Sequence, residues 1–321
     1  MLSLLDIIGA RHRLRGRVRE TPLVRSSALS RRAGRPVYMK LECWQQTGSF
    51  KVRGALNFLL QLAPDQGRRG LVTASAGNHG LGTAFGCRLL GLPLTVVVPS
   101  RSPQVKKEGI RAQGAQLLEV EGGYDIAHAA ALRLATEHGL TYVPAAEDER
   151  IMAGHGTIAL EAVDQLGTVP DFLVPVGGGG LVAGVGVAAH ALDPSARVIG
   201  VQSEATPAMY RSLQAGHPVP VEDLPTLCEG LAGNVEPIGF QYGRTVIDAM
   251  HLVSEEEVAD AICFLVREHR LLVEGSGGVG IAAILSSCIA SAESAHGRPI
   301  VVVLSGSNID APVLAHLLTP K

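Results

Sequence analysis

Aromatic residues are scarce in this chain: they make up 4% of its 321 residues, with a single tryptophan. The core must therefore be packed mainly with alanine, valine, leucine and isoleucine. No G-X-Y period or Ser/Gly-rich tract occurs, which excludes collagen-like and low-complexity classes. The 38 glycines are instead typical of α/β proteins, in which tight turns join strands to helices. The length favours one large domain or two smaller ones.

Cysteine and histidine patterns typical of metal or disulfide proteins are also missing. No C-x-x-C or H-E-x-x-H motif occurs, and the five cysteines are scattered: Cys43, Cys87, Cys228, Cys263 and Cys288. This spacing supports neither a zinc site nor a disulfide framework. No apolar run is long enough to span a membrane, and the first twenty residues lack the apolar core of a secretory signal. We therefore expect a cytoplasmic protein with no membrane partner.

The net charge of −2 hides an asymmetry. Residues 1–53 contain twelve Lys/Arg against three Asp/Glu, which leaves sixteen against twenty-seven for the remainder. A basic arm of this kind could contact nucleic acid, but its alternating arginines form no single helical face and no aromatic platform lies among them. The arrangement favours a solvated or intramolecular role, and we expect no nucleic-acid partner.

Strands and helices alternate along two parts of the chain. Short apolar strands are expected at 71–74, 94–98 and 115–120, each followed by a helix. A second series begins with an amphipathic helix around residue 158, and its strands are expected at 172–176, 198–201 and 299–304. This alternation predicts α/β architecture with two open twisted parallel sheets flanked by helices. We expect a small α/β domain at 61–146 and a large domain from 1–60 and 147–321.

Finer features follow from local signals. Two helices are predicted to begin with a capping box, one formed by Ser3 with Asp6 and the other by Ser254 with Glu257. Residues 64–70 read as a polar connection, and a late helix is expected to follow Gly280.

Lys51 lies between two apolar residues, behind a Thr-Gly-Ser turn at an expected helix start. Desolvation disfavours the charged form of a lysine and lowers its pKa, so a buried lysine can serve as an amine nucleophile. The alternative is a lysine whose stem packs while its ammonium reaches water. The remaining motifs have to decide between these interpretations.

Four glycines, Gly177 to Gly180, follow an expected strand and open a helix. Backbone N–H groups at a helix N-terminus bind phosphate because donors converge there and the helix dipole favours anions. A dinucleotide fingerprint fails here, since its sixth position is Val182 and the next strand ends in Gln202 rather than an acid. The pattern indicates a bare phosphate cup, with a tight turn that binds nothing as the alternative.

Two further strand-end loops carry polar groups. Residues 75–80 read Ser-Ala-Gly-Asn-His-Gly and could present N–H groups, a hydroxyl and an amide to a carboxylate, or simply cap a helix. Ser305 follows the last strand and could hydrogen-bond a ring nitrogen, or belong to an ordinary polar turn. With Lys51 and the glycines, these loops supply what is needed to hold pyridoxal 5′-phosphate, all at carboxyl ends of strands.

These motifs resemble, in order and spacing, those of the serine/threonine dehydratase (threonine ammonia-lyase-like) group of pyridoxal-phosphate enzymes. That group has the tryptophan-synthase-β fold, or fold type II, with its active site between two domains. The resemblance runs nearly end to end, through 21–23, 40–42, 47–55, 75–80, 153–161, 174–181, 274–278 and 305–310. It implies pyridoxal 5′-phosphate as the cofactor, bound in the large domain.

The resemblance also implies residue roles. Lys51 would bind the cofactor covalently and act as the catalytic residue, and Phe50 would pack beside the cofactor ring. Asn78 would hydrogen-bond the cofactor's 3′-oxygen, Ser305 would face its pyridine nitrogen, and Glu274 would lie near the ring. The phosphate would be held by Gly177, Gly178, Gly179 and Gly180. The substrate carboxylate would be held by Ser75, Gly77, Asn78 and His79.

The implied activity is that of a lyase: α,β-elimination from a β-hydroxy amino acid such as L-threonine or L-serine, giving a 2-oxo acid and ammonia in amino-acid catabolism. Freed Lys51 would remove the Cα proton, because the conjugated cofactor delocalises the developing charge. A serine facing the ring nitrogen cannot protonate it as an aspartate would, which favours elimination over transamination. Racemases of the group carry a second serine where this chain has Ala76, which disfavours racemisation here.

Alternatives stay open. The protein could be an amino-acid racemase, or a β-elimination lyase acting on hydroxyaspartate, phenylserine or a hydroxyectoine-derived substrate. From another class, a non-catalytic protein could use the four glycines to bind a phosphate metabolite.

Several residues depart from the group's pattern, and these departures bear on metal binding and on the substrate. Gln202 and Ala208 stand where metal-binding members have carboxylates, so we expect no metal at that site. Ser307 and Cys228 also depart from the usual residues and leave the exact substrate open. Because the chain stops at Lys321, we expect no feedback through the regulatory module of biosynthetic threonine dehydratases. The group is often dimeric, and a homodimer is expected.

Overall fold

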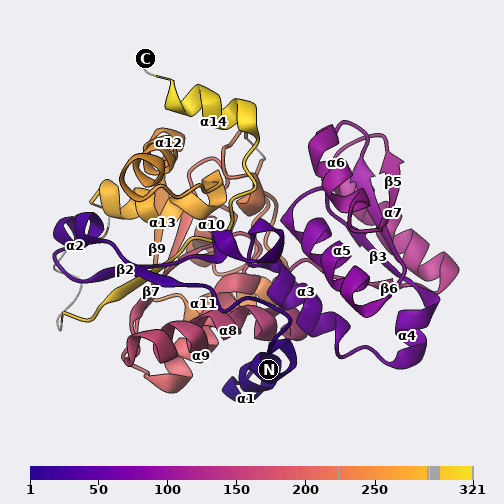
Figure 1. Ribbon diagram of the computed structural model, residues 1–321, viewed down its shortest axis with the longest axis horizontal. Coiled ribbons are helices and arrows are strands. Elements are labelled where there is room, and N and C mark those ends of the chain that lie inside the picture. The colour runs from indigo at the N-terminus through magenta and orange to yellow at the C-terminus, as the bar shows by residue number, and fades with distance from the viewer. Residues whose placement is uncertain (223, 288, 290–296, 320–321) are drawn as a thin grey trace.

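The computed structural model describes residues 1–222, 224–287, 289 and 297–319, which form two α/β units, each around its own open sheet (Figure 1). Within these residues the larger sheet has the order β1-β2-β10-β7-β8-β9. Its strands are β1 (Leu23–Arg25), β2 (Val37–Lys40), β7 (Asp171–Pro175), β8 (Val198–Ser203), β9 (Ala249–Val253) and β10 (Ile300–Val303). All neighbours are parallel except β1, which runs antiparallel to β2.

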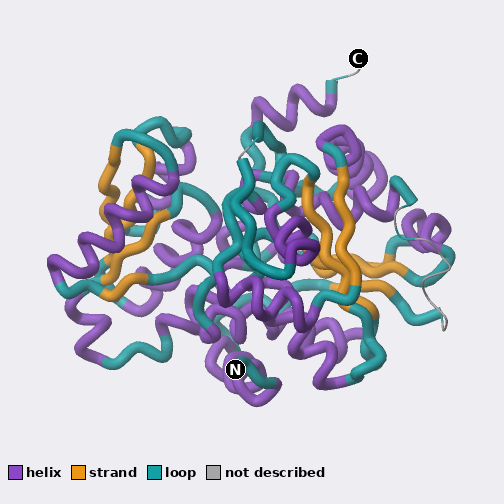
Figure 2. The backbone as a smooth tube through the Cα atoms, turned by 180° about the vertical axis from the view of Figure 1, so that it is seen from behind, coloured by secondary structure: helices purple, strands orange, loops and turns teal. Residues whose placement is uncertain are grey.

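The smaller sheet lies to the right in Figure 1 and has the order β5-β4-β3-β6, with all neighbours parallel. Its strands are β3 (Leu71–Ala74), β4 (Leu94–Pro99), β5 (Gln116–Val120) and β6 (Thr141–Tyr142). Figure 2 shows the two groups of strands well separated, with helices between them. The division into domains at 1–60 with 147–321 and at 61–146 remains our proposal.

Helices cover both faces of the larger sheet. One face packs against α1, α8, α9 and α11, and the other against α2, α12 and α13. The helices are α1 (Leu4–Leu14), α2 (Ser27–Ala33), α3 (Lys51–Leu59), α4 (Pro64–Arg69), α5 (Asn78–Leu90), α6 (Gln104–Arg111), α7 (Tyr124–His138), α8 (Glu149–Leu166), α9 (Gly180–Leu192), α10 (Ala208–Ala215), α11 (Pro237–Val246), α12 (Glu255–Phe264), α13 (Gly275–Leu285) and α14 (Ala311–Leu318).

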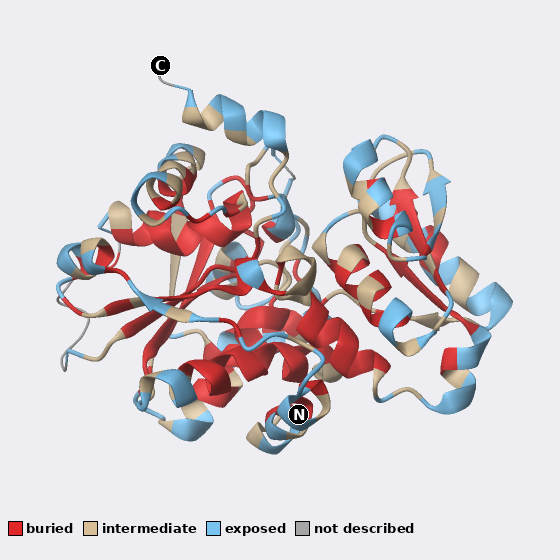
Figure 3. Ribbon diagram, viewed as in Figure 1, coloured by how far each residue is buried: buried red, intermediate tan, exposed pale blue. Residues whose placement is uncertain are grey.

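The centre of the molecule is formed by α3 and α8, which Figure 3 shows as almost wholly buried. Glycine lets these helices approach closely. A Cβ atom added to Gly154 of α8 would lie 2.7 Å from the Cα of Gly54 on α3. Real Cβ atoms do not come so close, so any side chain there would push the two helices apart. The start of α3 is thus rigidly seated on α8.

The predicted α/β architecture with two open sheets flanked by helices is confirmed; the smaller sheet is wholly parallel, and the larger one is parallel except for β1. Both capping boxes are confirmed as well: Ser3 accepts from the N–H of Asp6, and Ser254 from that of Glu257. No helix in the described part of the chain is both long and apolar enough to cross a membrane.

Two local expectations were wrong. Residues 64–70 contain a helix, α4, because Pro64 suits a first helical position and the Gln66 side chain accepts from the N–H of Ala63. Helix α13 begins at Gly275 rather than after Gly280, since its glycine-rich first turns pack against the last strand-end loop and the sheet. Among the cysteines, Cys288 lies outside the described residues, and Cys43, Cys87, Cys228 and Cys263 are free.

Candidate active site

Three neighbouring strands, β2, β10 and β7, end at one edge of the larger sheet. The chain after β2 leads through two short 3₁₀ turns to Lys51, the chain after β10 leads to Ser305, and the chain after β7 leads to Gly177. Because parallel strands place their carboxyl ends on the same side, these loops meet there. The lysine turn, the Ser305 loop and the four glycines therefore lie together because their strands are neighbours in the sheet.

Backbone hydrogen bonds tie the lysine turn to the Ser305 loop. The N–H of Phe50 donates to the carbonyl of Ser305 at 3.0 Å, and the N–H of Ser307 donates to the carbonyl of Gly48 at 2.9 Å. Ser49 forms an isolated antiparallel bridge with Gly306. The Lys51 backbone is thus held against the end of β10.

The Lys51 side chain is partly buried, and its Nζ donates to the carbonyl of Ala145 at 3.0 Å. The same Nζ lies 5.4 Å from the centre of the Phe50 ring. Burial lowers the pKa of Lys51, although the charges of Glu147 and Glu274 oppose the shift. The neutral form of the amine is therefore more populated than it is for a lysine in water. The neutral amine can act as a nucleophile or a base.

The four glycines form a turn without side chains at the start of α9. Gly179 has a φ of 96°, which favours glycine, and an added Cβ there would lie 2.9 Å from the carbonyl of Gly239. A Cβ on Gly180 would lie 3.1 Å from that of Ala146. Since Ala146 adjoins the carbonyl that holds Lys51, one loop links the glycine cup to the lysine. Free N–H groups of the first turn of α9 would favour an anion.

The loop after β3 brings the smaller sheet into the same region. Ser75 accepts from the N–H of Gly77 at 3.2 Å, and α5 begins at Asn78. The His79 ring, however, is buried in the small sheet's unit, with Nε2 3.0 Å from Thr73 Oγ1, and burial lowers its pKa to about 3. Any contact of His79 with a carboxylate would therefore come from its backbone N–H rather than from its ring.

Glu274 joins the two units through a network of amide contacts. Its carboxylate accepts from Asn78 Nδ2 at 2.7 Å and from the N–H of Asn308 at 3.1 Å. Asn308 Nδ2 in turn donates to Asn78 Oδ1 at 2.6 Å. Burial raises the pKa of Glu274 to about 7, against the hydrogen bonds from Asn78 and Asn308, which lower it. Near neutral pH this carboxyl group is poised to gain or lose a proton.

Glu274→Gln should remove a pH dependence of stability. Because the folded state raises the pKa of this carboxyl group from 4.5 to about 7, its contribution is fully present below pH ~4.5 and is lost as the pH rises through ~7. The loss is on the order of 3 kcal/mol. Urea unfolding should therefore show that the free energy of unfolding of the variant, relative to that of the wild type, is higher at pH 8 than at pH 5. Exposed Glu256→Gln is the control, and an equal difference at both pH values would contradict this assignment.

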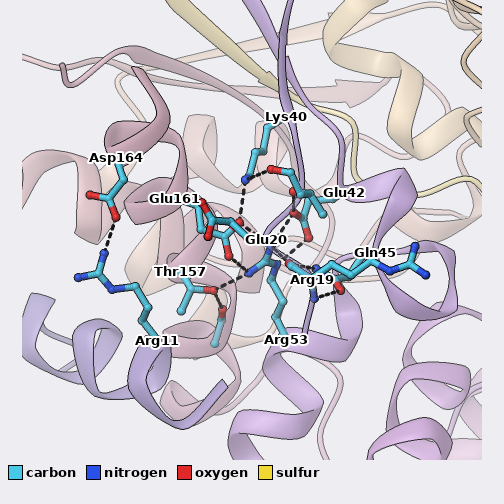
Figure 4. Close-up of polar contacts among 12 residues, drawn as sticks. Arg11, Arg19, Glu20, Lys40, Glu42, Gln45, Arg53, Thr157, Glu161 and Asp164 are labelled. Carbon is cyan, nitrogen blue, oxygen red and sulfur yellow. Dashed lines mark hydrogen bonds and ion pairs between the residues drawn. The ribbon is translucent and has the colours of Figure 1, made fainter. Parts of the chain in front are cut away.

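Beneath Lys51, on the same helix, Arg53 is fully buried in an ion-pair network (Figure 4). Its Nε donates to Glu42 at 2.7 Å and its Nη1 to Glu161 at 2.6 Å. Lys40 also donates to Glu161, at 2.7 Å. Two cations and two carboxylates balance, so the network fixes the first turn of α3 against β2 and α8 without leaving an unpaired charge.

Sequence reasoning did not find the contacts made by Asn308 and by the carbonyl of Ala145. Asn308 lies in the segment 305–310 that resembles the dehydratase group, but its residue type and spacing indicate no role, and a backbone carbonyl leaves no sequence signal. At Gln202, where we expected no metal ligand, the side chain accepts from the N–H of Tyr210 at 2.9 Å. Within the described residues, no group of three His, Cys, Asp or Glu side chains is arranged to hold a metal ion.

Comparisons with known proteins indicate the family to which this chain belongs. A family model described as pyridoxal-phosphate dependent enzyme matches residues 14–306. The chain is 40% identical to the L-threonine ammonia-lyase of Thermotoga maritima over 319 residues, covering 99% of this chain and 78% of that protein. The structure of maize serine racemase has a TM-score of 0.93 at 28% identity, covering 98% of this chain and 96% of that one.

A further solved structure, the processed form of threonine deaminase isoform 2 from Solanum lycopersicum, has a TM-score of 0.90 at 33% identity. The match covers 98% of this chain and 91% of that one. The expected fold-type II architecture is therefore confirmed. This chain belongs to the family of pyridoxal-phosphate dependent enzymes.

Proposed function

We propose that this protein is an ammonia-lyase that removes water from a β-hydroxy amino acid, with L-threonine and L-serine as first candidates, and releases a 2-oxo acid and ammonia. The observation that carries the proposal is the Lys51 amine, which lies where the ends of β2, β7 and β10 meet the loop after β6 and donates there to the carbonyl of Ala145. The name and 40% identity of the Thermotoga relative support the dehydration reaction.

The residues present fit pyridoxal phosphate. The glycine cup opens a helix, and an added Cβ at Gly177, Gly179 or Gly180 would lie within 3.1 Å of a neighbouring atom, which suits a close approach of a phosphate to the main chain. The hydroxyl of Ser305 makes one contact, to the carbonyl of Ser276 at 3.3 Å, and would face the ring nitrogen. Asn78 is proposed to hold the 3′-oxygen, with Phe50 and Glu274 beside the ring. When bound, the cofactor supplies a conjugated ring that stabilises negative charge on the substrate carbon next to the amine.

The protein's own residues bind the substrate and transfer the proton. Ser75, Gly77 and the N-terminus of α5 are proposed to bind and orient the substrate carboxylate. Lys51, whose pKa is lowered by burial, takes the Cα proton as a neutral amine. A Cα–Cβ double bond forms as the bond from the β-carbon to its oxygen breaks, and the hydroxyl group takes up one proton, equal to the one that Lys51 removed, and leaves as water. Hydrolysis of the enamine product gives the 2-oxo acid and ammonia.

Racemisation is the second candidate, favoured by the superposition on maize serine racemase. A racemase of this kind needs a second proton carrier on the opposite face of the substrate. At the position where the group's racemases carry a serine, this chain has Ala76, whose methyl group packs against the small-sheet core. Elimination therefore remains the preferred reading.

A substrate screen tests the proposal. The purified protein with pyridoxal phosphate should release 2-oxo acid and ammonia in equal amounts from L-threonine or L-serine, in preference to hydroxyaspartate or phenylserine. Chiral analysis of the L-serine reaction should find little D-serine. Faster formation of D-serine than of 2-oxo acid would favour the racemase. No turnover of any substrate, with phosphate metabolites still bound, would favour the non-catalytic alternative.

The resemblance to the dehydratase group also supports proposals for the oligomeric state and the cellular location. We propose that the enzyme is a homodimer and works in the cytoplasm. Size-exclusion chromatography with light scattering would test the oligomeric state.

A further inference from the structure

His155, on α8, has a fully buried side chain, and neither ring nitrogen makes a hydrogen bond of good geometry among the described residues, although the main chain of Gly180 lies close enough to raise the pKa of the ring. Buried polar groups are ordinarily paired, and leaving one unpaired costs roughly 1–3 kcal/mol. An apolar side chain of similar size would fill the space without that cost. The ring therefore calls for an explanation beyond core packing.

The ring is wedged between α8 and the lysine turn. It meets the Phe50 ring edge to face, with centroids 4.7 Å apart and planes at 65°. Its Nε2 faces Gly54 so closely that a Cβ there would clash with it. Phe50 in turn lies 5.4 Å from the Nζ of Lys51. Two successive contacts thus connect His155 to the catalytic amine.

The electrostatic surroundings keep this ring neutral. Burial lowers the pKa of His155 well below its ordinary value, the charge of Lys51 lowers it further, and the main chain of Gly180 opposes the shift. Gly180 begins α9 and belongs to the glycine cup. The ring therefore lies between the two halves of the cofactor site, beside the lysine turn on one side and the cup on the other, without adding a second positive charge near Lys51.

We propose that His155 is a positioning residue: a flat, neutral wedge that fixes the Phe50 ring, and through it the Lys51 amine, relative to the glycine cup. The inference rests on the proposed function only in taking Lys51 as the cofactor-binding residue. The imidazole fits because Gly54 has no side chain: a Cβ there would overlap Nε2. A flexible aliphatic side chain would let Phe50 turn and would misplace the amine.

The test compares holoenzymes with His155→Leu, which is neither flat nor polar, and His155→Gln, whose amide is planar and neutral. Misplacing a reacting group by about 1 Å reduces rates by about 100-fold, so we expect kcat of the Leu variant to fall about 10- to 100-fold with KM nearly unchanged. The visible absorbance band of its bound cofactor should weaken or shift. The Gln variant should keep kcat within about threefold of wild type.

Ile158→Val is the matched control, because Ile158 is equally buried on α8 and the substitution lowers stability by about 1 kcal/mol. It should leave kcat and the visible band unchanged. If His155→Leu does no more than this control, His155 is a core residue and the proposal fails. Equal defects in the Leu and Gln variants would also overturn it, since a planar neutral group would then not suffice.

A double-mutant cycle with Phe50→Leu tests whether His155 acts through Phe50. In that background His155→Leu should change kcat and the band little further, whereas fully additive effects would overturn the proposal. Should His155→Leu fail to fold, His155→Met takes its place in the cycle. Two readouts separate the two hypotheses. A wild type without 2-oxo acid release refutes the lyase, whereas a His155→Leu variant that retains the cofactor with a wild-type visible band refutes the wedge.

Discussion

Lys51→Ala is expected to abolish 2-oxo acid formation and the visible absorbance of the bound cofactor. Proton transfer by a positioned base contributes about 10²- to 10⁴-fold, and this variant also loses the covalent anchor, so the fall in kcat should reach or exceed that range. The partly buried amine is held by the carbonyl of Ala145, whereas the Lys40 amine at the end of β2 is ion-paired with Glu161. Spectra and 2-oxo acid release of the purified variant measure both effects.

The matched control is Lys107→Met. Lys107 is ion-paired with Glu119 at 2.7 Å in the smaller unit and plays no part in the site. The control should keep both colour and turnover. A coloured, active Lys51→Ala protein would refute the assignment of the lysine.

Arg53→Met is expected to lower the free energy of unfolding by about 3–5 kcal/mol, because it leaves Glu42 and Glu161 buried without their main cation. The side chains of Arg53 and Glu42 are 0% exposed, so water cannot solvate the carboxylate that loses its partner. Adding Glu42→Gln should recover part of the loss by removing one of the stranded charges. Urea unfolding of the single and double variants measures both changes.

Arg11→Met is the control for this substitution. Arg11 pairs with Asp164 at 2.8 Å, but the side chains are 45% and 63% exposed, and such a pair contributes about 0–1 kcal/mol (Figure 4). If Arg53→Met were no more destabilising than Arg11→Met, the buried network would not secure the first turn of α3.

The arrangement of the site followed from the sequence wherever a strand ends in a loop of distinctive composition. The lysine turn, the four glycines and Ser305 each follow an apolar run, and parallel strands place such ends together. Helices α10 and α11 and strand β9 were not predicted, because prolines and mixed polarity obscure their periodicity. Their existence depends on packing against the larger sheet, which no local signal records.

Contacts between distant residues could not be predicted. Arg53 and Glu161 are 108 positions apart and meet only because α8 crosses beneath α3. His79 was expected to help hold the substrate carboxylate, and that assignment stays a prediction. Thr73 and Val143 hold its ring inside the smaller unit, which leaves its backbone N–H for the role. Composition identifies which groups can do chemistry, whereas the direction of each side chain is decided by tertiary packing.

The most direct test of the central claim is the site of covalent attachment. Borohydride reduction of the protein with bound pyridoxal phosphate, followed by proteolysis and mass spectrometry, should place the phosphopyridoxyl group on the peptide containing Lys51, and on Lys51 itself after fragmentation. Recovery of the group on Lys40, Lys106 or Lys107 instead, or of no modified peptide from a coloured protein, would contradict the account.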